Sequence, residues 1–325
     1  MRLHENEKLF TQSVRFTAQQ RGIKDIYIEK DYWVTFALYT IFNSAASAYA
    51  VFKGGTALSK CYGIIERFSE DIDMVVLNEG ESGNQLKERL RKLAKSIESV
   101  LPEIEVKEIT NKRGMIRKTA HSYPKKFKGN YGQVRDYLVL ESTWLGYHEP
   151  YTNKEISSFI YQMMMETGQE EMAQAYHLMP FEVRVLDTTR TLCEKGMSLV
   201  RFSHSQTPIE DLRLKIRHLY DIHQLLNIPD LLTFFKSEAF EVMLKKVAQS
   251  DVIGYKNNNQ WLSIHPKEAL LFKSATATWA ALENTYKGQF ADMVFGSLPP
   301  ADEILKTVEH ISHRLQSVTW SISLD

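Results

Sequence analysis

The chain has 325 residues, of which 43% are hydrophobic and 25% are charged, as in an ordinary globular protein of two domains. Lys and Arg number 40 and so do Asp and Glu, so no net field draws the chain to nucleic acid or membrane. Any polyanion site must therefore be a local patch. Cys61 and Cys193 are far apart without a CxxC pair, which argues against a disulfide or zinc framework and favours a reducing compartment. The N-terminus has no signal-peptide pattern and no apolar run could span a bilayer, so we expect the cytoplasm.

Hydrophobic spacing in the first half of the chain alternates between helical and strand periods. It predicts helices over 4–20, 29–46, 56–63 and 84–100. It predicts strands over 49–53, 71–77, 104–110, 113–121 and 133–143, with the last three antiparallel.

After about residue 185 the spacing is helical throughout. It predicts helices over 187–202, 209–226, 230–249, 266–288 and 301–317. The fold class is therefore α+β, with a mixed domain over 1–185 and a helical domain over 186–325. No Gly/Ser linker separates the two domains, so we expect them to pack tightly. We also expect the helical domain to close the active-site cleft of the mixed domain.

A glycine pair, Gly54-Gly55, follows the predicted strand 49–53 and is followed by Thr56. Glycine lets a phosphate approach backbone N–H groups, and a helix starting just after the turn favours anions. Thr56 adds a hydroxyl. The pattern lacks the Lys-Ser/Thr ending of a Walker loop, so an ordinary strand–helix turn is the alternative.

Asp71 and Asp73 are two residues apart on an apolar strand, so their side chains share one face. Two carboxylates this close repel unless a cation lies between them, and Mg²⁺ prefers such oxygen ligands together with phosphates. A solvated strand face is the alternative. Glu141, in another apolar strand, is the best candidate for a third metal ligand, unless it is only an edge-strand carboxylate.

The helical half places Lys195 and Asp221 inside apolar helices. Lys195 could hold nucleotide phosphates as a point charge, and Asp221 could orient it. A structural Lys–Asp pair is the alternative. His218 and His223 are five residues apart rather than four, which is typical of packed or solvated histidines rather than a metal pair.

Basic residues gather between 107 and 135, interleaved with Tyr123, Phe127 and Tyr131. Such a patch can follow a phosphate backbone and stack on bases, so we predict an RNA-binding surface, with a solvated loop as the alternative. The predicted RNA-binding residues are Lys112, Arg113, Arg117, Lys118, Lys125, Lys126 and Lys128.

Three segments together resemble the AbiEii/AbiGii abortive-infection toxin family, whose members are nucleotidyltransferases of the polymerase-β superfamily. They are 28–34 (IEKDYWV), 52–60 (FKGGTALSK) and 67–73 (RFSEDID). The resemblance continues in 192–195 (LCEK) and 217–222 (RHLYDI) and so reaches about residue 226.

The resemblance implies a polymerase-β-type mixed sheet and a Mg²⁺-dependent enzyme that binds an NTP. It implies metal ligands at Asp71 and Asp73 and catalytic roles for Lys195 and Asp221. The implied nucleotide-binding residues are Lys53, Gly54, Gly55, Thr56, Arg67, Ser69 and Lys195. It also implies a toxin with a separate antitoxin, and some members transfer nucleotides to the 3′ end of tRNA.

The sequence therefore predicts a phage-defence toxin that transfers an NMP from an NTP to an RNA 3′ hydroxyl, with tRNA as the expected acceptor. Two alternatives stay open. One is a nucleotidyltransferase that acts on a protein or a small molecule. The other is a toxin that binds NTP without catalysis and works through a partner.

Overall fold

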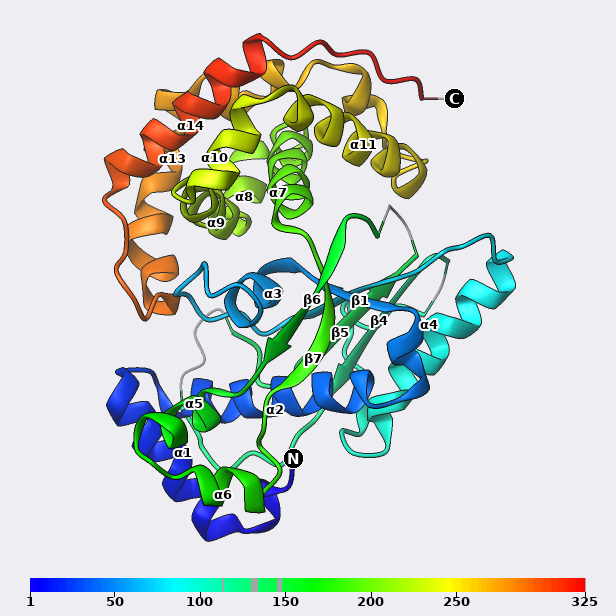
Figure 1. Cartoon of the computed structure of the whole chain (residues 1–325). Coiled ribbons are helices and arrows are strands. Elements are labelled where there is room, and N and C mark those ends of the chain that lie inside the picture. Colours follow the sequence, from blue (N-terminus) through cyan, green and yellow to red (C-terminus); the bar gives the residue numbers. More distant parts are fainter. Residues whose placement is uncertain (113, 130–133, 145–147, 325) are drawn as a thin grey trace. The chain divides into compact units, whose positions relative to one another are not determined.

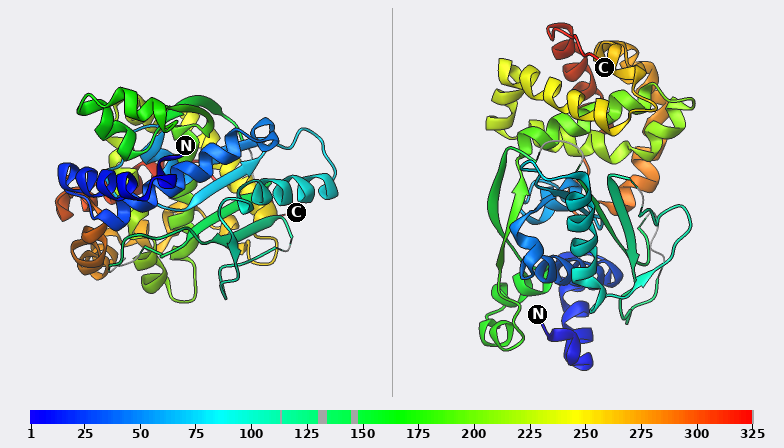
Figure 2. Two further views of the ribbon diagram at one scale, coloured as in Figure 1. Left: turned by 90° about the horizontal axis from the view of Figure 1, so that it is seen from below. Right: turned by 90° about the vertical axis from the view of Figure 1, so that its right-hand side faces the viewer.

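The structure is a computed structural model that describes residues 1–112, 114–129, 134–144 and 148–324 (Figure 1). The chain divides into two compact units. Unit 1 comprises 1–63, 67–144 and 151–185, and unit 2 comprises 64–66, 145–150 and 186–325. Unit 1 carries the sheet, whereas unit 2 is built from helices (Figure 2). The domain limits given above and the closing role of the helical part stay predictions.

Unit 1 combines helices with one mixed sheet. Its helices are α1 (Glu7–Arg21), α2 (Asp25–Phe42), α3 (Gly54–Lys60), α4 (Gly83–Glu98), α5 (Phe159–Glu166) and α6 (Glu170–Ala175). Its strands are β1 (Ala50–Lys53), β2 (Ile72–Val76), β3 (Glu103–Ile104), β4 (Ile116–His121), β5 (Leu138–Thr143), β6 (Tyr151–Ile156) and β7 (Phe181–Leu186).

Over the described residues the sheet has seven strands in the order β3-β4-β5-β2-β1-β7-β6. β2 runs parallel to β5 and antiparallel to β1, while β4 is antiparallel to both β3 and β5. The α+β fold class predicted from the sequence is confirmed, and so is the antiparallel pairing of β3, β4 and β5.

Two helices of unit 1 illustrate how the sequence specifies the fold. In α4 the Ser82 hydroxyl accepts from the Gln85 N–H while the Gln85 side chain accepts from the Ser82 N–H, a capping box that fixes where the helix starts. Its leucines at 86, 90 and 93 are buried, and α4 packs on β4, β5 and β2. Helix α2 is buried on nearly every side, and α1 packs against both α2 and α5 (Figures 1 and 2).

Several helices of unit 2 are shorter than the sequence spacing predicts, because three predicted helices are divided. In chain order, the helices of the unit are α7 (Thr188–Ser203), α8 (Pro208–Leu214), α9 (Ile216–Leu226), α10 (Pro229–Lys236), α11 (Glu238–Gly254), α12 (Leu270–Lys273), α13 (Ala275–Thr285), a π-helical turn (Tyr286–Phe290) and α14 (Ala301–Gln316). Breaks at Lys215, Ser237 and Ser274 divide three segments that the spacing predicts as single helices. The apolar periodicity continues across each break, so it does not reveal them. None of the described helices is long and apolar enough to cross a membrane.

Strand prediction was wrong in two places. The segment 104–110 is a strand only at Glu103–Ile104 and then turns, with Glu108 in the left-handed region at φ 70°. Strands β6 and β7 were missed. The exposed polar residues of β6, Tyr151–Glu155, carry no alternating apolar signal.

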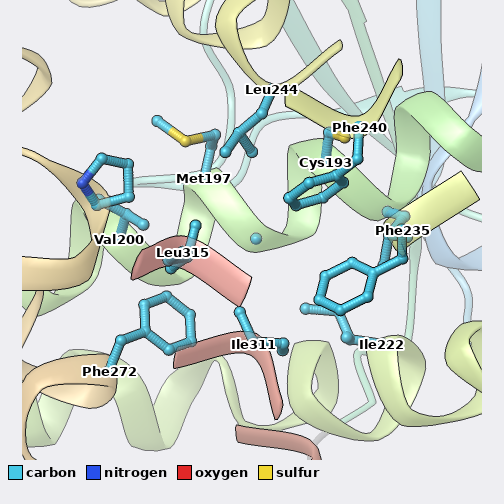
Figure 3. Close-up of a pocket in the computed structure, with 13 residues that line it drawn as sticks. Cys193, Met197, Val200, Ile222, Phe235, Phe240, Leu244, Phe272, Ile311 and Leu315 are labelled. Carbon is cyan, nitrogen blue, oxygen red and sulfur yellow. The ribbon is translucent and has the colours of Figure 1, made fainter. Parts of the chain in front are cut away.

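A small cavity of about 20 Å³ lies in the apolar core of unit 2 (Figure 3). Its walls come from α7, α9, α10, α11, α12, α14 and the turn at Pro266, with Cys193, Met197, Phe235 and Leu244 among the side chains (Figure 3). Its apolar lining offers nothing that could hold a polar ligand, so we interpret it as a packing defect. Gly196, in the middle of α7, lines it as well.

We expect Gly196→Ala to stabilise the protein. A Cβ at this position meets no atom within 4 Å. Alanine gains about 0.5–1 kcal/mol over glycine inside a helix, and a methyl group that fills the cavity adds up to about 0.8 kcal/mol. Urea unfolding should show the free energy of unfolding rise by about 1 kcal/mol. Gly288→Ala, at an exposed position of the π-helical turn where a Cβ also meets no atom within 4 Å, is the control and should gain no term from filling a cavity. A loss of stability in Gly196→Ala would contradict the expectation.

Candidate functional site

The glycine turn joins β1 directly to α3. Gly54 is the first residue of α3 and has φ +81°, a conformation that glycine adopts without strain. A Cβ on Gly54 would lie 3.1 Å from Cγ of Asp73 and closer still to its Oδ2. Gly54 is therefore required both for the backbone turn and for the position of the Asp73 carboxylate. The sequence spacing predicts a helix that starts at residue 56. In the structure the helix starts two residues earlier, at Gly54.

Gly55 and Thr56 connect the turn to the segment before β2. A Cβ on Gly55 would lie 2.6 Å from Nη2 of Arg67 and 2.9 Å from Oγ of Ser69. The Thr56 hydroxyl donates to the Asp71 carbonyl at 2.7 Å and is 3.0 Å from Ser69 Oγ. Five of the residues predicted to bind nucleotide are thus close together in unit 1. They are Gly54, Gly55 and Thr56 from the turn and Arg67 and Ser69 from the segment before β2.

A row of charged residues crosses four neighbouring strands of the sheet. Lys53 on β1 is opposite Asp73 on β2, Asp73 is opposite Glu141 on β5, and Glu141 is opposite Lys118 on β4. Directly opposed residues on adjacent strands share a face of the sheet, about 4.8 Å apart. Lys118 Nζ is 2.8 Å from Glu141 Oε2. Two carboxylates at the centre of the row are therefore flanked by an ammonium group at each end.

Asp71 comes one residue before β2, on the same side as Asp73. Its Oδ1 is 3.1 Å from Nη1 of Arg135, a half-exposed side chain. Arg135 also reaches Glu70, because its backbone N–H donates to Glu70 Oε1 at 3.0 Å. Arg135 thus contacts both Glu70 and Asp71 and orients the Asp71 carboxylate.

The donor set at this site fits a divalent cation such as Mg²⁺. Asp73 and Glu141 supply hard carboxylate oxygens from opposed positions, and a cation between them relieves their repulsion. Among the described residues no three Asp, Glu, His or Cys side chains converge as a complete metal cage. Mg²⁺ commonly binds one or two carboxylates and completes its shell with substrate phosphates and water, which agrees with this arrangement.

Comparison with known proteins identifies the family. The model of the AbiEii nucleotidyl transferase toxins of type IV toxin–antitoxin systems matches residues 37–307. The chain belongs to this family. Among solved structures, MenT4, a nucleotidyltransferase toxin from Mycobacterium tuberculosis, is similar over 94% of this chain and 97% of that one, with 15% identity and a TM-score of 0.49. No curated protein matches the sequence significantly.

In this AbiEii-family chain, three consecutive charged residues of α2 are buried and tie the site together. Glu29 accepts from the backbone N–H groups of Lys126 and Phe127 at 2.6 and 3.2 Å. Asp31 accepts from Lys60, at the end of α3, at 2.5 Å and from the Phe159 N–H at 2.8 Å. Between them, Lys30 contacts Glu70 and donates to the carbonyl of Arg135. Lys30 therefore supports the two residues that position Asp71.

Burial opposes the charges of the Lys30–Glu70 pair. It lowers the pKa of the Lys30 ammonium and raises the pKa of the Glu70 carboxyl, while the contact between the two groups acts against both shifts. Lys30 is fully buried and Glu70 nearly so. Neither group has water to replace its partner, so the loss of Lys30 leaves Glu70 with only the Arg135 guanidinium, 3.6 Å from Glu70 Oε1, as a counter-charge.

Lys195 and Asp221 form a buried ion pair within unit 2, with Nζ 2.6 Å from Oδ2. Both are placed by apolar helices, α7 and α9, as the spacing predicts. Burial lowers the pKa of His218 well below its usual value, and the positive charges of Lys195 and Arg217 add to this effect. His223 Nδ1 is 2.8 Å from the Thr307 hydroxyl, so His223 is a packed residue rather than one of a metal pair. The catalytic roles of Lys195 and Asp221 stay predictions.

The basic residues predicted to bind RNA do not form one patch. Lys118 pairs with Glu141, Lys125 with Asp136 and Lys126 with Glu7. Lys112 and Arg117 line a groove with residues of α4. Lys128 is exposed, and Arg113 lies outside the described residues.

Sequence reasoning missed Lys30, Glu70 and Arg135 as parts of the site. A signal for Lys30 was present, because Glu29-Lys30-Asp31 places three charges in an otherwise apolar helix. Buried charges of this kind need partners, but the sequence does not show which residues supply them. Glu70 and Arg135 come from segments 40 and 105 residues away from Lys30.

We expect Gly54→Ala to displace the Asp73 carboxylate as well as strain the backbone. Gly22 provides a matched control, since it also has positive φ, +64°, but a Cβ there meets nothing within 4 Å. The left-handed strain, roughly 1–2 kcal/mol, should be common to both alanine variants. Urea unfolding should therefore show a larger loss for Gly54→Ala than for Gly22→Ala. If both variants lose the same free energy of unfolding, the Asp73 side chain can move aside without destabilising the protein, which would contradict this expectation.

We expect Lys30→Met to destabilise the protein by up to about 3–5 kcal/mol, because it leaves the buried Glu70 carboxylate with only the Arg135 guanidinium, 3.6 Å away, as a counter-charge. The double variant Lys30→Met/Glu70→Gln removes both charges and should recover part of that loss in urea unfolding. Arg21→Met, which breaks an ion pair with the exposed Glu166, is the control and should cost no more than about 1 kcal/mol. A cost at Lys30 as small as that at Arg21 would contradict the role assigned to the buried pair.

Proposed function

We propose that this AbiEii-family chain is a Mg²⁺-dependent enzyme that transfers an NMP from an NTP to the 3′ hydroxyl of an RNA, with tRNA as the acceptor. The observation that carries the proposal is the position of the Asp73 carboxylate over the glycine turn, with Glu141 opposite. It places the groups suited to a metal ion directly beside the turn suited to a triphosphate.

In the proposed reaction the 3′ oxygen of the acceptor forms a bond to the α-phosphorus of the NTP. The bond from that phosphorus to the β-phosphate oxygen breaks, pyrophosphate leaves and the hydroxyl proton passes to solvent. Asp71, Asp73 and Glu141 would hold Mg²⁺, which supplies charge neutralisation at the phosphates when bound. The reaction therefore asks of the protein mainly positioning and electrostatic stabilisation.

The remaining predicted residues have proposed roles as well. The Gly54–Thr56 turn allows phosphates close to the backbone, and the first N–H groups of α3 have no partners within the helix. Arg67 and Ser69 hold the turn against the segment that carries Asp71. Lys195 is the proposed point charge for the phosphates, oriented by Asp221.

As a type IV toxin the protein would be controlled by a separate antitoxin, and we propose phage defence as its role. NTP and RNA are both available in the cytoplasm, where we expect it to act. The two alternatives, a protein or small-molecule acceptor and a toxin that binds NTP without catalysis, are outcomes of the experiment below.

We expect the protein to label total tRNA when incubated with Mg²⁺ and each radiolabelled NTP in turn. Asp73→Asn should lower the rate about 100-fold or more, because a metal contributes several kcal/mol and each 1.36 kcal/mol is tenfold. EDTA should abolish labelling and Mg²⁺ should restore it. Asp230→Asn, an exposed aspartate in α10, is the control and should keep full activity.

The remaining outcomes separate the alternatives. Labelling of protein or of small molecules in a lysate, but not of RNA, would replace RNA as the acceptor. Binding of NTP without release of pyrophosphate, combined with toxicity that survives Asp71→Ala/Asp73→Ala, would favour the non-catalytic toxin. Labelling of tRNA that is equal in the wild type and Asp73→Asn would contradict the proposed site.

A further inference from the structure

A basic groove of about 440 Å³ lies in unit 1 between α4 and the hairpin that leads into β4. The hairpin folds Asn111 back onto Lys118 through two backbone hydrogen bonds. The side chains that line the groove include four cations and one acid. They are Lys87 and Arg91 from α4, Lys112 and Arg117 from the hairpin and strand, and Glu88.

The cations of the groove are only partly neutralised by the protein. Arg91 forms a bidentate pair with Glu88, at 2.6 and 2.5 Å, and Lys112 is 2.5 Å from Glu103. All four of these side chains stay partly accessible to solvent. Within the described ranges, no carboxylate lies within 4 Å of the Lys87 ammonium or the Arg117 guanidinium. The groove thus keeps a net positive charge in a chain whose overall charge is zero.

Arg117 contributes a guanidinium group to the groove lining. A guanidinium group in a solvent-filled groove binds phosphate oxygens well, because its donors match them in a bidentate geometry.

The Arg117 side of the groove is on the opposite face of the sheet from the carboxylates. Arg117 and Lys118 are consecutive in β4, so their side chains point to opposite faces, and Lys118 is the one that contacts Glu141. Laterally, β4 is two strand spacings from β2, about 10 Å at 4.8 Å per strand. A ligand in the groove therefore does not reach the carboxylates directly, yet it lies within a few nucleotides of them.

We propose that this groove binds the phosphate backbone of the acceptor RNA at a distance from its reacting 3′ end, an inference that rests on the proposed function. Lys87, Arg91, Lys112 and Arg117 would contact phosphates. No aromatic side chain lines the groove in the described residues, so it offers no surface for stacking bases. Binding should therefore be independent of base sequence and strongly dependent on salt.

An acidic protein is the competing partner. Protein partners usually anchor large apolar or aromatic side chains in apolar pockets. The groove has only Leu90 and Ile116 as apolar lining side chains, and its walls are otherwise polar and charged. This composition favours a phosphate backbone.

The test measures RNA binding without NTP, so it does not depend on catalysis. In an Asp73→Asn background, fluorescence anisotropy with labelled tRNA would compare two double variants that each remove two charges. Lys87→Gln/Lys112→Gln alters the groove. Lys92→Gln/Lys95→Gln alters exposed lysines of α4 outside the groove lining and is the matched control.

We expect the groove variant to bind about tenfold or more weakly near 100 mM salt, and the control to change by less than about twofold. The slope of log Kd against log salt should become shallower by about 1.5 in the groove variant, since two phosphate contacts are lost. In active protein the same pair should raise the KM for tRNA and leave kcat unchanged. Lys87→Arg/Lys112→Arg should retain binding.

Equal weakening in both double variants would show a general charge effect and overturn the proposal, and so would unchanged binding in the groove variant. Unchanged RNA binding together with lost binding of labelled poly-glutamate would assign the groove to an acidic protein instead. If tRNA binds through the groove but is never labelled, the proposed reaction fails while the groove assignment stands.

Discussion

The direct opposition of Asp73 and Glu141 on parallel strands is the constraint on which the rest of the site depends. Two carboxylates at adjacent positions repel, and the sheet places Lys53 and Lys118 at the two outer ends of the same row. A slip of one residue in any of these pairings would send a charge to the other face of the sheet. The apolar residues of β2, buried at Ile72, Met74, Val75 and Val76, fix that register. The core of unit 1 therefore determines where the acids lie.

Buried charged side chains also support the site, although removing a charge from water costs free energy. A buried ion pair such as Lys30–Glu70 can often be replaced as a whole by apolar residues at little cost to stability. Apolar residues could not supply the directional hydrogen bonds and ion pairs that the charged side chains of Glu29, Lys30 and Asp31 form. Each of the three charges holds a different segment at a defined atom: the loop at 126–127, the Glu70–Arg135 pair beside Asp71, and the end of α3. Apolar packing is non-directional and would leave these segments free to shift.

The sequence predicted the parts of the site that are local and missed those that depend on distant pairing. Gly54-Gly55 and Asp71-x-Asp73 can be recognised because turn and strand geometry act over a few residues. Glu141 could be named as a candidate third ligand from its apolar strand, but its exact partner, Asp73, follows only once β5 is placed beside β2, which no short pattern encodes. The groove was missed for a related reason. Lys87 and Arg91 belong to a helix that looks like an ordinary solvated face until β4 is placed beside it. The basic segment 107–135 was predicted as one patch, yet ion pairs with Glu141, Asp136 and Glu7 engage much of it.

Side chains alternate between the two faces of a strand, so the consecutive residues Arg117 and Lys118 of β4 contact different surroundings. Lys118 contacts an acid of the candidate metal site, and Arg117 faces a groove suited to phosphate. Because the two side chains share one rigid strand, an RNA held by the groove is held at a fixed distance from the carboxylates. Affinity from remote contacts can then position the acceptor without placing more positive charge beside the metal, where it would compete for the same carboxylates. In the proposed role, a chain with no net charge would achieve this by concentrating a few cations in one place, whose field would orient an RNA at close range rather than attract it from a distance.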